Sequence, residues 1–254
     1  MAFAFIPVES ITDEEALEVD FFHDFLVFLR YVQKQPIKRT VTGNISLHDI
    51  HQFRSVFKQQ KTFKEFDEMN WKISTERQVQ VLHQIRIMAE TMQLIYKRRD
   101  KFLLSKNGSG YLHNISSAIQ YGNMVTHFWR RVNWGYFSPG KDIDGLCVAE
   151  VLQDNQDTIW SAFLKNGEKW VNFAVFCQTL KHYFALQPYY AESENERFDL
   201  FLDIEYGLFY RNLIPFGCIE IEKKIMEHGI ARISQFRATK RGLFLFHNAG
   251  EFYW

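Results

Sequence analysis

The chain has 254 residues, of which 46% are hydrophobic, 17% aromatic and 24% charged. This composition is typical of a soluble globular protein and excludes a disordered or fibrous chain. The net charge of zero conceals a segregation, because residues 30–131 carry +11 whereas residues 1–29 and 132–231 carry −7 each. The basic segment is either neutralised within the molecule or offered to an anionic partner.

The sequence gives little indication of a membrane span, a signal peptide or a disulfide framework. No apolar run approaches the roughly 18 residues of a spanning helix, and residues 1–7 lack the pattern of a signal peptide. We therefore expect a cytoplasmic protein with no membrane partner. Cys147, Cys177 and Cys218 lie far apart without a C-x-x-C pair, which favours buried free thiols over disulfides or a zinc site.

The first half of the chain predicts a helix, a strand, two helices and then two strands. A capping box at Thr12-Asp-Glu-Glu15 opens a helix to about residue 32, and residues 37–41 are of extended type. Ser46 caps a second helix to about residue 58, and Thr75 caps a third over 75–92. Residues 94–96 and 101–104 predict two short strands around a basic turn.

The second half follows the same order. We predict a helix over 157–164, a strand over 169–171 and a helix over 173–186 capped by Asn172. A third helix spans 196–213, and strands at 218–221 and 230–236 follow it. Between the two halves, residues 116–132 predict a further helix.

A short pattern occurs at the end of both halves. Phe102-Leu-Leu-Ser-Lys-Asn-Gly108 and Phe236-Arg-Ala-Thr-Lys-Arg-Gly242 share an aromatic residue, a hydroxyl residue, a lysine and a glycine at the same spacing. An internal repeat of this kind predicts two copies of one structural unit. We expect a mainly α protein with short β hairpins, built from two winged-helix-like modules (residues 1–115 and 154–254) joined by a helical connector (residues 116–153).

Three local motifs carry a family resemblance. They are Thr42-Gly-Asn-Ile45 before a helix, the strand that ends in Ser/Thr-Lys-x-Gly, and Gly167-Glu-Lys-Trp-Val171 in the second copy. With them, most of residues 37–246 resembles the paired winged-helix regions of uncharacterised prokaryotic proteins, including plasmid-type open reading frames. The chain is also similar to the non-catalytic front part of some repair helicases. The resemblance implies a fold and no established activity, and the chain has no P-loop or helicase motor.

The candidate nucleic-acid site lies in the first copy. Arg77, Gln80 and Gln84 follow helical spacing opposite the apolar stripe of the third helix, where side chains of helix-turn-helix proteins reach base edges. The hairpin turn adds phosphate-binding candidates at Lys97, Arg98, Arg99 and Lys101. The alternative is a solvated helix face and a charged hairpin that blunts a sheet edge.

The second copy argues against another such site, because the comparable positions are Glu196, Asp199 and Asp203. We expect this module to hold a protein partner or a second subunit. His48-x-x-His51 lacks further metal ligands, so we expect no metal and no cofactor. No catalytic motif is present, although distant His, Glu and Asp residues leave an enzyme open as an alternative.

Two classes of function follow. The first is a non-enzymatic regulatory or accessory protein that binds double-stranded DNA through the first module. The second is an interaction or scaffold protein of winged-helix-like fold without nucleic-acid contact. The fold alone does not separate them.

Overall fold

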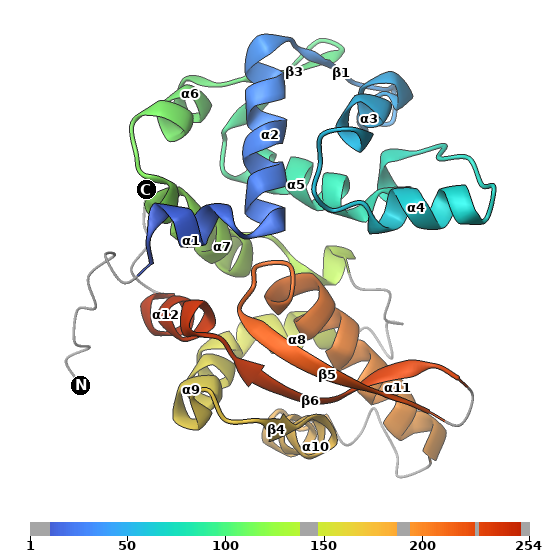
Figure 1. Ribbon diagram of the computed structural model, residues 1–254, viewed down its shortest axis with the longest axis vertical. Helices are drawn as coiled ribbons and strands as arrows, with labels where there is room; N and C mark the ends of the chain where they lie inside the picture. Colours follow the sequence, from blue (N-terminus) through green and yellow to red (C-terminus); the bar gives the residue numbers. More distant parts are fainter. Residues whose placement is uncertain (1–10, 138–146, 187–193, 227–228, 250–254) are drawn as a thin grey trace. The chain divides into compact units, whose positions relative to one another are not determined.

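The computed structural model of the protein describes residues 11–137, 147–186, 194–226 and 229–249, with the side chains of 194–198 excepted. The chain is mostly helical and contains two small antiparallel sheets, as the sequence predicts (Figure 1). It divides between Val132 and Asn133 into an N-terminal unit and a C-terminal unit, which are described separately.

The N-terminal unit begins with two helices and ends with two helices, and the strands of its small sheet lie between them in the chain. Its elements are α1 (Asp13–Leu17), α2 (Asp20–Lys34), β1 (Ile37–Lys38), α3 (Leu47–Arg54), α4 (Lys61–Glu68), the 3-10 helix η2 (Glu76–Gln78), α5 (Gln80–Thr91), β2 (Ile95–Arg98), β3 (Lys101–Leu104), α6 (Lys106–His113) and α7 (Ser117–Arg131).

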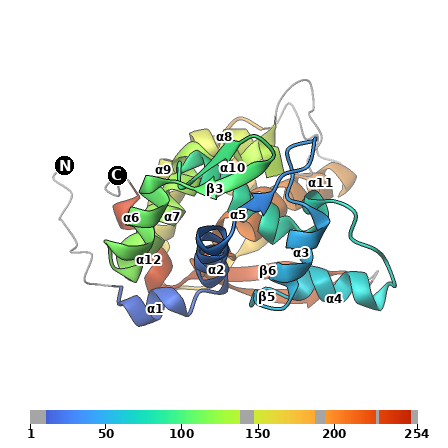
Figure 2. The same ribbon diagram turned by 90° about the horizontal axis from the view of Figure 1, so that it is seen from above.

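Helix α2 supplies much of the core of this unit. Its residues Phe21, Phe22, Phe25 and Phe28 are each at most 1% exposed. Phe22 packs edge-on against Tyr121 of α7 at 5.6 Å between ring centroids, and α5 packs against both α2 and α7 (Figures 1 and 2). Buried aromatic rings of this kind contribute both transferred area and specific geometry. The predicted capping box at Thr12 is confirmed, but it caps the separate short helix α1.

The C-terminal unit repeats much of this order. Its elements are the 3-10 helix η3 (Trp134–Phe137), α8 (Val148–Asp154), α9 (Gln156–Asn166), β4 (Val171–Asn172), α10 (Phe173–Tyr183), α11 (Glu194–Ile204), the π-helical segment η5 (Glu205–Leu213), β5 (Ile219–Ile225), β6 (Ala231–Ala238) and α12 (Lys240–Asn248).

The two sheets have the same topology. Strand order is β1-β3-β2 in the N-terminal unit and β4-β6-β5 in the C-terminal unit, with every pair antiparallel. In each, a two-residue strand that precedes a capped helix pairs with the last strand of the hairpin. The two hairpins predicted at 94–104 and 218–236 are confirmed, and β5 and β6 extend beyond the predicted strands.

The repeated sequence pattern has the same structural role in both units. The hydroxyls of Ser105 and Thr239 cap α6 and α12 by accepting from the amides of Gly108 and Gly242. The same hydroxyls donate across the base of the hairpin, to the carbonyls of Gln93 (2.6 Å) and Gly217 (2.8 Å).

The glycine of the pattern allows each of these helices to lie against its hairpin. A Cβ added at Gly108 would clash with the carbonyl oxygen of Leu94, and one at Gly242 would lie 2.7 Å from the carbonyl carbon of Cys218. The aromatic residue of the pattern, Phe102 or Phe236, is buried where the short first strand meets the hairpin. The repeated pattern therefore lets a helix pack closely against the hairpin that precedes it.

The expected connector is divided in the structure. Helix α7 belongs to the N-terminal unit, where it contacts α1 and α5, whereas α8 belongs to the C-terminal unit and contacts α9 and α11. Residues 138–146 lie outside the described residues. The boundary between units thus falls after α7 and not at residue 115, because the apolar face of α7 is buried with α1 and α5.

Candidate nucleic-acid interface

A row of cations crosses the N-terminal sheet. Lys38 of β1 pairs with Lys101 of β3, and Lys101 pairs in turn with Arg98 of β2. All three side chains are exposed. Like charges at directly opposed positions destabilise a sheet, so this row is an electrostatic cost within the free protein.

Alternation along the strands places the row on the outer face of the sheet. Ile37 and Phe102, one residue along from Lys38 and Lys101, are fully buried and form the inner face. Lys97 pairs with Phe102 and so belongs to the inner side, where its ammonium lies 3.1 Å from the Glu90 carboxylate. The predicted cation Lys97 is therefore neutralised in part and separated from the outer row.

The turn of the hairpin adds the guanidinium group of Arg99, and Arg39 holds this turn through hydrogen bonds. Arg99 has a φ of +55°, a left-handed conformation that closes the turn between β2 and β3. Arg39 donates from its amide to the carbonyl of Asp100 at 2.7 Å and from its side chain to the carbonyl of Arg99 at 3.3 Å. No ion pair to Arg98, Arg99 or Lys101 occurs among the described residues. We call the exposed residues Lys38, Arg98, Arg99 and Lys101 the basic face, and the half-buried Arg39 supports the turn beside it.

Lys38 and Arg39 are absent from the set that the sequence predicts. Both follow Ile37 in a segment of extended type, which is a weak signal for a strand. Only the pairing of β1 with β3 brings them to the hairpin, and long-range strand pairing is not encoded in local pattern.

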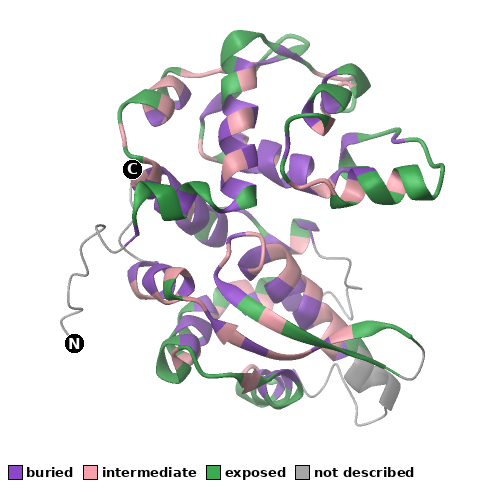
Figure 3. Ribbon diagram, in the orientation of Figure 1, coloured by how far each residue is buried: buried purple, intermediate pink, exposed green. Residues whose placement is uncertain are grey.

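The prediction that the third helix exposes Arg77, Gln80 and Gln84 on its outer face is wrong for Gln84. Gln84 is 3% exposed, and eight of the twelve residues of α5 are buried (Figure 3). The cause is that α5 packs against α2, α7 and η2 together. Gln80 is half-buried, and Arg77 is exposed but lies in η2 and not in the helix. Helix α5 therefore lacks the open face of a helix that enters a major groove.

A buried ionic cluster fixes α5 beside the hairpin. The Glu76 carboxylate accepts from Arg86 Nε at 2.7 Å and from the Ile45 amide at 2.5 Å, and it lies 2.7 Å from His83 Nδ1. Burial raises the pKa of Glu76, but the His83 hydrogen bond, the Arg86 charge and the Ile45 amide together hold it below its ordinary value. Arg86 also contacts Glu90, which in turn holds Lys97. The charge of Arg86 is therefore neutralised by carboxylates within the unit.

The corresponding hairpin of the C-terminal unit differs in charge. Arg237 of β6 donates to Glu220 of β5 through Nε at 2.8 Å and Nη2 at 2.6 Å, so this pair is neutral. The Lys223 ammonium lies over the ring of Tyr210, 5.1 Å from its centroid. Of the acidic positions predicted on the third helix, Asp199 is exposed, Asp203 is half-buried, and the Glu196 side chain lies outside the described residues.

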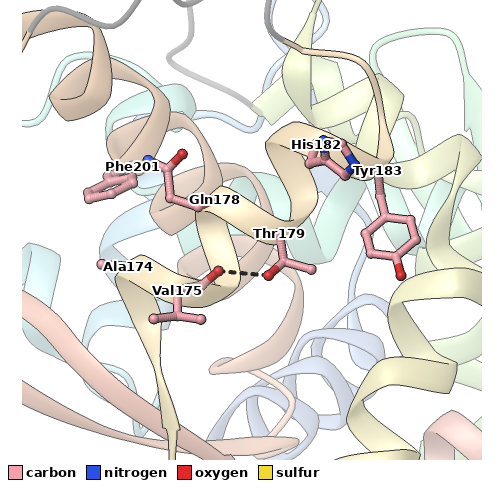
Figure 4. Close-up of a pocket in the computed structure, with 7 residues that line it drawn as sticks. All are labelled: Ala174, Val175, Gln178, Thr179, His182, Tyr183 and Phe201. Carbon is pink, nitrogen blue, oxygen red and sulfur yellow. Dashed lines mark hydrogen bonds between the residues drawn. The ribbon is translucent and has the colours of Figure 1, made fainter.

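The C-terminal unit also carries a groove of about 740 Å³ along α10. Ala174, Val175, Gln178, Thr179, His182 and Tyr183 line it together with Phe201 of α11 (Figure 4). Val175 and Tyr183 are 64% and 71% exposed, and Thr179 uses its hydroxyl to donate to the Val175 carbonyl. The groove is open and mostly apolar, without the paired ionisable groups that acid–base catalysis needs.

Comparison of the chain with protein-family models, with curated proteins and with solved structures gives no significant match. Within the described ranges, no group of three His, Cys, Asp or Glu side chains is arranged to hold a metal ion. Among the same residues, no helix combines the length and the apolar character required to cross a bilayer.

Proposed function

We propose that the N-terminal unit binds the phosphate backbone of DNA through the basic face. The observation that carries the proposal is the cross-strand row Lys38–Lys101–Arg98, because three opposed cations are unfavourable in isolation and favourable beside phosphate. A role as a cytoplasmic, non-enzymatic regulatory or accessory protein fits such a site.

The order of elements supports a winged-helix assignment for both units. In the N-terminal unit, α2, β1, α3, α5, β2 and β3 follow the helix, strand, helix, helix, strand, strand order of that fold, with α4 as an additional helix between α3 and α5. The basic hairpin then occupies the position of the wing. The resemblance to tandem winged-helix regions supports the same assignment.

Burial of α5 changes the expected mode of binding. With Gln84 inside the unit and Gln80 half-buried, the base contacts of a recognition helix have little support. We therefore propose contacts that depend on phosphate charge more than on base sequence.

Salt dependence tests the proposal directly. Duplex DNA binding should weaken as salt rises, with a log-log slope of about −0.9 for each phosphate contacted. Replacing Arg98 and Arg99 with Ala should flatten the slope by about one to two units on every sequence. The matched control is the double replacement of Lys223 and Lys224, which lie on the corresponding hairpin and outside the basic face. A folded protein that binds no DNA at low salt would overturn the proposal.

The groove on α10 favours a second function, protein interaction through the C-terminal unit. Val175 and Tyr183 are exposed along this mostly apolar groove, and a contiguous exposed apolar surface is a common site for a protein partner. This candidate predicts self-association or partner binding that Tyr183→Ser weakens and that Arg98→Ala leaves unchanged. Sedimentation of the two variants at several concentrations distinguishes them.

A further inference from the structure

The outer face of the N-terminal sheet carries one exposed aromatic ring beside the basic row. Tyr96 of β2 is two residues from Arg98, so the two side chains point to the same face about 6.6 Å apart along the strand. The Tyr96 residue is 44% exposed, and its partner across the sheet is the half-buried Leu103. Ring and cations thus form one continuous surface on β2 and β3.

Among the residues that the structure describes, the side chain of Tyr96 makes no hydrogen bond or ring contact that would explain it as a structural residue. Within the described residues, its hydroxyl makes no hydrogen bond and its ring stacks on no other aromatic ring. A buried or half-buried tyrosine ordinarily finds a partner for its hydroxyl, whereas an exposed one is available for contact. Tyr96 is therefore an accessible ring held at a fixed distance from three cations by strand geometry.

We infer that this face binds single-stranded DNA, with a base stacked on Tyr96 and the adjoining phosphates at Lys101 and Arg98. The inference rests on the proposed function and specifies its substrate. Known single-strand-binding modules use this combination of an exposed aromatic ring and cations on a sheet, since stacking requires a free base face and duplex bases are already stacked. Reading the bases of a duplex with a helix in the major groove would instead require an open helix face, and α5 is buried.

Two ligands and three variants test the inference. Fluorescence anisotropy of the full chain should show tighter binding to an unstructured oligonucleotide than to a duplex of the same length. Tyr96→Leu should weaken binding to the single strand by about 5- to 150-fold, the range expected for loss of one stacked base. Tyr96→Phe should retain binding, because it keeps the ring. Tyr136→Leu, at an exposed tyrosine in the C-terminal unit and away from the α10 groove, should have no effect.

The outcomes separate the inference from the function on which it rests. Tighter binding to duplex than to single strand, with no effect of Tyr96→Leu, overturns the inference and leaves the proposed function standing. If the folded wild-type protein binds neither the single strand nor the duplex, both the inference and the proposed function are overturned.

A measurement on the unaltered protein guards against a variant that fails to fold. An oligonucleotide that contains 5-iododeoxyuridine, irradiated in complex with the wild-type chain, should crosslink to Tyr96. Crosslinks that map only to other residues overturn the inference.

Discussion

Two glycines on the same short helix should respond to alanine with opposite signs. Gly108 and Gly110 both lie within α6. An added Cβ at Gly110 meets only Asn114 Nδ2 at 3.6 Å, an ordinary contact. Gly110→Ala should therefore raise the free energy of unfolding by about 0.5–1 kcal/mol, the usual gain from alanine in a helix.

At Gly108 the same change inserts a methyl group between helix and hairpin. The new Cβ would overlap the Leu94 carbonyl oxygen and lie 2.7 Å from Leu104 Cδ1. Relief requires α6 to move away, which breaks the 2.8 Å hydrogen bond from the Ser105 amide to the same carbonyl. Overpacking typically costs about 1–3 kcal/mol, more when backbone must shift, so Gly108→Ala should lower stability by about 2 kcal/mol or more.

Urea unfolding followed by far-ultraviolet circular dichroism measures both changes. The midpoints should move in opposite directions with similar m-values. If Gly108→Ala were as stable as the wild type, the close approach of α6 to the hairpin would be refuted, and with it the structural reading of the repeated pattern.

Two further predictions concern buried ionisable groups. Glu76→Gln should destabilise the N-terminal unit by about 3 kcal/mol, since it leaves Arg86 and the Ile45 amide without their carboxylate. Because the folded pKa of Glu76 is lowered, its contribution is present above the unfolded pKa of about 4.3 and is lost as pH falls through the folded value; unfolding titrations between pH 7 and pH 3 should show this slope in the wild type and a smaller one in the variant. Burial raises the pKa of the Cys177 and Cys218 thiols, so both should resist a thiol reagent until the protein unfolds, whereas the less buried Cys147 should react first; rapid labelling of Cys177 or Cys218 in the native protein would contradict their burial.

The features that the sequence predicts well are local ones. Hydroxyl and amide caps at Thr12, Ser46 and Asn172 each make the expected hydrogen bond to a backbone amide. The two hairpins also lie where short apolar runs surround basic or glycine-containing turns. Caps and turns depend on residues within a few positions of one another, so a single sequence suffices to find them.

The features that the sequence misses depend on tertiary packing. Helix α4 lies in a stretch that reads as polar, and only Phe63 of its eight residues is buried. The first predicted helix divides at Val19 into α1 and α2, although its apolar pattern continues through the break. Gln84 shows the same limit at the candidate site, because helical spacing gives relative positions and not which faces other helices cover.

The basic face itself offers a test of whether its charge serves a ligand. Lys101 is opposed by Lys38 on one side and Arg98 on the other, so it takes part in both unfavourable pairs of the row. Each such pair costs about 0.2–1 kcal/mol, and Lys101→Gln should therefore raise the free energy of unfolding by about 0.5–2 kcal/mol while it weakens DNA binding. Lys106→Gln, at an exposed lysine outside the row, should change neither quantity by a comparable amount. Unfolding and DNA titrations on the same preparations measure the two effects. A Lys101→Gln protein that gained stability without loss of affinity would mean that the row is a solvated sheet face, since relief of repulsion would then carry no functional cost.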